Sequence, residues 1–66
     1  MRILYERIIE GGKRYVEAAG LSTEAKPADV VTGSIVFLKD ASAGTWKAYL
    51  YEETSGKWTD KEGNEG

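Results

Sequence analysis

Apolar and polar residues alternate along most of the chain, in short runs that are separated by glycine-containing breaks. Alternation with a period of two is typical of strands whose two faces meet different surroundings. The pattern predicts strands at residues 2–10, 13–19, 34–39, 46–53 and 58–60. We therefore expect an all-β protein.

The first run, RILYERIIE at residues 2–10, fits a helix as well as a strand. A helix would place Leu4 and Ile8 on one face, whereas a strand separates them from Ile3 and Ile9. Glycines follow at positions 11 and 12, and each would cost a helix about 1 kcal/mol relative to alanine. The same glycines accept the positive φ of a tight hairpin turn. We therefore predict a hairpin.

Residues 20–34 (GLSTEAKPADVVTGS) lack the alternation and form a predicted connection. Pro27 removes a backbone donor and disfavours a helical conformation at Lys26. One helical turn capped near residues 22–24 is the alternative, but Pro27 leaves it almost no length. The connection is therefore expected to be extended or turned.

Two further predictions concern the end of this connection. Val30 and Val31 are expected to point inward and anchor the segment, and Gly33 indicates a tight bend before the third strand. Residues 40–45 (DASAGT) and 54–57 (TSGK) have turn composition.

Short turns join every pair of consecutive strands except the second and third. The fold class that follows is a small antiparallel five-strand meander, with residues 1–60 forming one domain. Residues 61–66 (KEGNEG) hold no apolar side chain and are expected to form a flexible polar tail.

The strand at 46–53 is apolar on both faces. Trp46, Ala48 and Leu50 alternate with Tyr49 and Tyr51. A strand of this kind is normally buried on both sides, which five short strands cannot achieve in a flat sheet. The alternatives are a sheet that curls into a barrel, an oligomer, and docking onto a partner.

Composition limits the chemistry. Sixty-six residues build one small core, and the chain contains neither Cys nor His. Disulfides, thiolate zinc sites and the usual general base are therefore unavailable. Glu52 and Glu53 are adjacent on a strand, so their carboxylates point to opposite faces and do not form a pair for hydrolysis or for metal binding. We expect no enzyme activity, no metal and no cofactor.

Charge and hydropathy limit the surroundings. The net charge is −2 and the basic residues are scattered, which argues against nucleic acid as a partner. The longest apolar runs, such as Ile35–Leu38, are four residues and too short to span a membrane, so we expect no membrane partner. The first residues lack the pattern of a secretory signal, which favours the bacterial cytoplasm or a particle assembled there.

Aromatic residues gather toward the C-terminus. The candidate interaction face comprises Trp46, Tyr49, Tyr51 and Trp58. Exposed rings on a sheet bind glycans or single-stranded nucleic acid, whereas paired rings across strands are ordinary packing. Packing is the favoured interpretation because so small a domain has few other large side chains to bury.

A Ser-Thr-x-x-Lys-Pro loop, a Gly-Ser strand start, a Tyr-x-Tyr strand with acidic residues and a closing Trp occur in this order. In this pattern the chain resembles small uncharacterised β proteins encoded by bacteriophages and prophages. The matching residues are Ser22, Thr23, Lys26, Pro27, Gly33, Ser34, Tyr49, Tyr51, Glu52, Glu53 and Trp58. The turn KDASAGTWKAY is longer here and adds Trp46, so no role of that turn is carried over. The resemblance implies a virion or assembly protein and no known activity.

The resulting expectation is a non-enzymatic structural or protein-interaction component, associated with a protein partner or with itself. The alternative is a small ligand-binding module whose exposed aromatic rings bind glycans or single-stranded nucleic acid.

Overall fold

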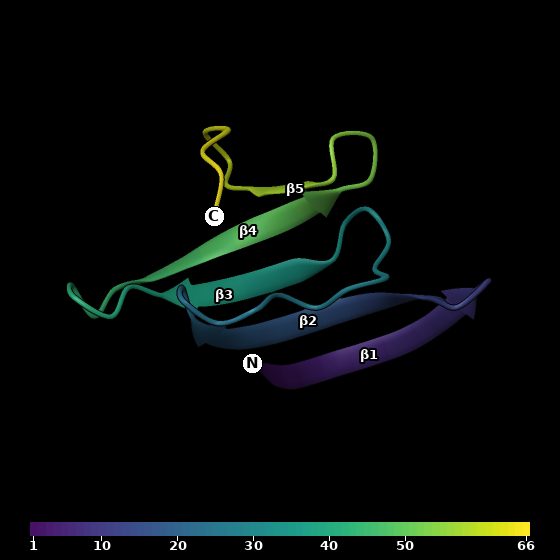
Figure 1. Ribbon diagram of the computed structural model, residues 1–66, viewed down its shortest axis with the longest axis horizontal. Coiled ribbons are helices and arrows are strands. Elements are labelled where there is room, and N and C mark those ends of the chain that lie inside the picture. Colours follow the sequence, from purple (N-terminus) through teal and green to yellow (C-terminus); the bar gives the residue numbers. More distant parts are fainter.

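The computed structural model describes residues 1–66 and contains one sheet of five strands (Figure 1). The strands are β1 (Arg2–Glu10), β2 (Lys13–Leu21), β3 (Ile35–Lys39), β4 (Trp46–Glu52) and β5 (Lys57–Thr59). Their order across the sheet follows the order in the chain. The all-β prediction is confirmed, and each strand lies within two residues of its predicted limits. The fold contains no helix of the length and hydrophobicity that a membrane crossing needs.

The β1–β2 hairpin turns at two glycines, as predicted. Gly11 and Gly12 have φ values of 61° and 80°, a region that residues with a Cβ adopt only at a cost. Gly33, at φ 96°, makes the predicted bend before β3. The β3–β4 and β4–β5 pairs are also antiparallel.

The prediction of an entirely antiparallel meander is wrong for one pair, because β2 and β3 run parallel. Residues 22–34 leave the end of β2 and return to its beginning, where Val30 forms a bridge with Arg14. The chain then re-enters the sheet in the direction of β2, with Glu17 opposite Ile35. A parallel pair needs a connection of about a dozen residues or more, and this segment has that length.

The sheet remains open and does not close into a barrel. Its buried side chains lie on one face, called here the covered face, together with Val30 of the connection. The buried hydrophobic residues are Val16, Ala18, Val30, Val36, Leu38 and Trp58. The prediction for Val30 is thus confirmed, while Val31 is only half-buried. The core consists of one sheet face and the segments that cross it.

Residues 61–66, predicted as a flexible tail, turn back along β5. The Gly66 N–H donates to the Trp58 carbonyl at 2.9 Å, and Thr59 forms a bridge with Glu65. Gly66 lies against the ring of Tyr49, on the covered face. The end of the chain therefore contributes to the cover over this face.

Candidate interaction surface

The four aromatic residues predicted as an interaction face divide between the two sides of the sheet. Tyr51 and Trp58 are directly paired, with ring centroids 5.0 Å apart and planes at 49°. Trp58 is buried, and Tyr49 and Tyr51 are partly buried against the core. Trp46 points to the opposite side and is 56% exposed. The structure thus brings three of the rings together and separates Trp46 from them.

The side of the sheet that carries Trp46 is called here the open face. Residues opposite one another in a ladder point to the same side, so the register identifies its members. Its large apolar side chains include Tyr5, Tyr15, Leu21, Ile35, Phe37, Trp46 and Leu50. Most of them are exposed. Monomeric soluble proteins rarely expose apolar side chains in so continuous a group, which marks the open face as a surface for recognition.

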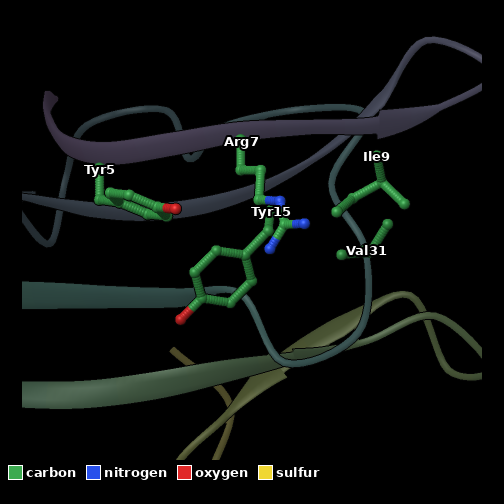
Figure 2. Close-up of a pocket in the computed structure, with 5 residues that line it drawn as sticks. All are labelled: Tyr5, Arg7, Ile9, Tyr15 and Val31. Carbon is green, nitrogen blue, oxygen red and sulfur yellow. The ribbon is translucent and has the colours of Figure 1, made fainter.

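A hollow of about 360 Å³ lies on the open face beside the end of the hairpin (Figure 2). Tyr5, Arg7 and Ile9 of β1, Tyr15 of β2 and Val31 of the connection line it. The Tyr5 and Tyr15 rings meet edge to face, with centroids 6.0 Å apart. Arg7 lies directly opposite Tyr15 and forms no ion pair. The hollow thus combines apolar walls with one positive charge that lacks a partner.

The Tyr15 hydroxyl makes one polar side-chain contact, and this contact disfavours a role for Tyr15 in proton transfer. Its O–H donates to Glu17 Oε2 at 2.7 Å. This hydrogen bond to a carboxylate, followed by partial desolvation, raises the pKa of Tyr15. The phenol stays protonated at neutral pH, and its ring packs against that of Tyr5.

A second hollow, of about 340 Å³, lies where β4 extends beyond β5. β5 pairs only with Leu50–Glu52, so the beginning of β4 has no neighbour on that side. Trp46, Ala48 and Leu50 form its apolar wall, and Lys47, Asp60, Lys61 and Glu62 line the remainder. The exposed ring of Trp46 is therefore bordered by charges of both signs.

Asp60 organises the C-terminal turn. Lys47 Nζ lies 2.9 Å from its Oδ2, and the N–H groups of Glu62 and Asn64 donate to Oδ1 at 2.9 and 2.8 Å. The hydrogen bond from Lys47, together with these N–H groups, holds the pKa of Asp60 far below its ordinary range, against the opposing effect of desolvation. The side chain is 3% exposed. All its contacts are within the chain, so the role that they indicate is structural.

Glu52 and Glu53, at the end of β4, accept hydrogen bonds from residues of the neighbouring turns. Glu53 Oε1 accepts from Lys13 Nζ at 2.7 Å, and this hydrogen bond lowers the pKa of Glu53. Glu52 Oε1 accepts from Thr54 Oγ1 at 2.9 Å. Nowhere in the chain do three or more Asp and Glu side chains gather as metal ligands.

β1 is a surface that the sequence analysis did not single out. All nine of its residues are exposed, and Ile8 is 69% exposed. Ile3, Leu4 and Ile9 are exposed as well. The indication in the sequence was that RILYERIIE, like the strand at 46–53, is apolar on both sides. An edge strand this long and this apolar is an unusual feature in a monomer.

Comparisons with known proteins add no relative. No protein-family model matches the chain, and neither a curated protein nor a solved structure matches it. A function for the chain therefore has to be inferred from the two surfaces described above, the open face and the edge strand β1.

Proposed function

We propose that this chain is a non-enzymatic structural or protein-interaction component whose open face is covered by protein in the functional state. The observation that supports the proposal is the asymmetry of the sheet. The connection and the C-terminal turn cover one face, whereas Phe37, Trp46 and Leu50 on the other are exposed to solvent.

The size of the core supports the same conclusion. Only 8 of 66 residues are buried, and six of these are hydrophobic. A single core in a domain of this size rarely supplies more than about 3 to 5 kcal/mol of stability. Covering the open face would remove further apolar surface from water, at about 25 cal/mol per Å². Association would thus supplement a marginal core.

The area of the face suits a protein partner. The molecule measures 38 × 23 × 15 Å, so its broad side projects an area of roughly 800 Å², which is what each partner contributes to an interface of standard size. Aliphatic, aromatic and charged side chains are mixed on this face, as in protein interfaces.

The alternative, a module that binds glycans or single-stranded nucleic acid, receives less support. As predicted from the sequence, this module would use at least two exposed rings among Trp46, Tyr49 and Tyr51 on one surface. Tyr49 and Tyr51 lie on the covered face and Trp46 on the open face. A clear hit on a glycan array would reverse this ranking.

We place the chain in the bacterial cytoplasm or in a phage particle, as a virion or assembly accessory protein. This part of the proposal depends on the resemblance to phage and prophage proteins. Mass spectrometry of purified phage particles, made by cells that carry the gene, tests it directly. Detection of the chain in the particles or in their assembly intermediates is expected, and its absence from both would contradict the phage role.

Site-specific photo-crosslinking tests the proposed use of the open face. A photoreactive phenylalanine at position 37 lies within this face, and one at Thr54 lies in the exposed turn after β4. In cells that make the protein, we expect crosslinks to protein from position 37 and few from position 54. Equal yields at the two positions, or none at either, would contradict a protein-covered face.

A further inference from the structure

We propose that two copies of this chain pair through β1, antiparallel and about a two-fold axis at Glu6, so that two sheets join into one of ten strands. This inference goes beyond the proposed function and does not depend on it. It concerns the edge of the sheet, whereas the proposed function concerns the open face.

The edge is available for pairing. β1 ends the strand order and pairs only with β2, so the backbone groups on its outer side have no neighbour (Figure 1). Two register shifts interrupt β1, at Leu4 and Ile9, and the ladder between them, from Tyr5 to Ile8, is regular. Bulges protect many edge strands, but here they leave the centre of the strand free to accept another strand.

The sequence of β1 is complementary to itself when it is read antiparallel about Glu6. Arg2 then faces Glu10 of the second copy, so that opposite charges meet at both ends. Leu4 faces Ile8. Opposite charges and apolar pairs directly across two strands stabilise a sheet. Arg2 and Glu10 form no ion pair within the chain, so both are free for this contact.

Neighbouring registers lack this complementarity. A shift that keeps each side chain on its own face moves the pairing by two residues. One such shift places Glu6 opposite Leu4 and Arg7 opposite Ile3. The other places Arg7 opposite its own copy and Glu6 opposite Ile8. Each sets charges against apolar side chains or like charges against each other, so the register about Glu6 is favoured.

The axis itself brings two carboxylates together, which alone would be unfavourable. Each Glu6, however, accepts from its own Arg14, with Nη1 2.5 Å from Oε2. Two ion pairs would therefore face each other across the axis. Arg14 is anchored in turn, because its Nη2 donates to the Ala28 carbonyl at 3.2 Å.

The same register completes the hollow in Figure 2. Tyr5 of one copy stands opposite Arg7 of the other, on the open face. Arg7 has no acidic partner within its own chain, and a guanidinium beside a tyrosine ring is a favourable cation–π contact. The second copy would thus supply the missing neighbour of this charge.

A charge exchange at the strand ends tests the register. Arg2→Glu sets two glutamates opposite each other twice in the dimer, and Glu10→Arg does the same with two arginines. We expect either single variant to raise the dimer dissociation constant, measured by sedimentation equilibrium, roughly tenfold, and the double variant to return it toward the wild-type value. No recovery in the double variant, or a strictly monomeric wild-type protein, would overturn the proposal.

A cysteine at the axis gives an independent test that does not depend on charge. The chain contains no cysteine, so a single introduced thiol reports only on association. Under mild oxidation Glu6→Cys should form a disulfide-linked dimer, because directly opposed residues are about 5 Å apart. Ile8→Cys is the matched control, since four residues of strand, roughly 13 Å, would separate its two copies. Equal crosslinking of both variants would contradict the register.

The two proposals fail in different ways. If position 37 forms crosslinks in monomeric protein while Glu6→Cys forms no dimer, the β1 pairing is overturned and the open-face proposal is supported. A Glu6→Cys dimer with the charge-exchange behaviour, but no crosslinks from position 37, would support β1 pairing and contradict a covered open face.

Discussion

Ser34 and Val16 are joined by a buried hydrogen bond, in which the Val16 N–H donates to Ser34 Oγ at 3.1 Å. Both residues are fully buried. Ser34 stands directly before β3, where the parallel ladder with β2 begins, at Glu17 opposite Ile35. A side-chain oxygen thus accepts the backbone donor next to the start of the ladder.

Ser34→Ala should therefore destabilise the fold by about 1 to 3 kcal/mol, because the buried Val16 N–H would lose its acceptor. Urea denaturation followed by circular dichroism measures the change. Ser42→Ala is the matched control in an exposed turn and should leave the free energy of unfolding almost unchanged. Equal effects of the two variants would contradict the role of Ser34.

The two tryptophans should differ in their effect on stability. Trp58→Ala removes a buried ring that packs on Tyr51 and is expected to cost about 3 to 5 kcal/mol, which is enough to unfold most of the protein. Trp46→Ala removes an exposed ring and should change the stability by less than about 1 kcal/mol. A large loss of stability from Trp46→Ala in dilute, monomeric protein would show that its ring is not free.

Acid should weaken the contacts of Asp60 selectively. The pKa of Asp60 is lower in the folded state than in the unfolded state, so its contribution is present above the unfolded pKa and is lost as pH falls through the folded pKa. Asp60→Asn should lower the melting temperature at pH 7. The difference from the wild-type protein should shrink as pH falls below about 4.

Asp29→Asn is a suitable control for this titration, because the Asp29 carboxylate forms no ion pair within the chain. It should keep the acid response of the wild-type protein. A difference between Asp60→Asn and the wild-type protein that stays constant from pH 7 to about pH 2 would show that the charge of Asp60 does not contribute.

The bend at Gly33 should resist substitution for backbone reasons alone. Its φ is 96°, and no atom lies within 4 Å of the position that a Cβ would occupy. Gly33→Ala should therefore cost about 1 to 3 kcal/mol, from strain and not from a clash. The chain is short enough for chemical synthesis, and D-alanine at the same position, which favours positive φ, should restore most of the loss in thermal unfolding.

Short-range features of the fold could be predicted from the sequence. The alternation of residue types placed five strands close to their observed limits, and Gly11 with Gly12 identified the first hairpin. The same alternation correctly set Tyr49 and Tyr51 on the face opposite Trp46 and Leu50. These features depend on neighbouring residues and on the pleat of a strand, which the order of residue types expresses directly.

The direction of β3 and the surroundings of the two faces could not be predicted in this way. A tight turn forces the chain to reverse. Residues 22–34 are instead long enough to return alongside β2, as the bridge between Arg14 and Val30 shows, so β3 can start in the direction of β2. The sequence marked both faces of β4 as apolar without indicating which one the connection would cover.

The sequence by itself thus determined the strands, their turns and the two faces of β4, because these depend on local backbone geometry. It did not determine the faces of β1, where register shifts at Leu4 and Ile9 interrupt the alternation and set Ile3 and Tyr5 on opposite sides. Only the tertiary structure decided that β2 and β3 are parallel, that Trp58 is buried while Trp46 is exposed, and that β1 forms an unpaired edge. The physical reason is that burial depends on which segments return over a surface. That return is decided by contacts between residues distant in the chain, such as Val30 with the core and Gly66 with Tyr49.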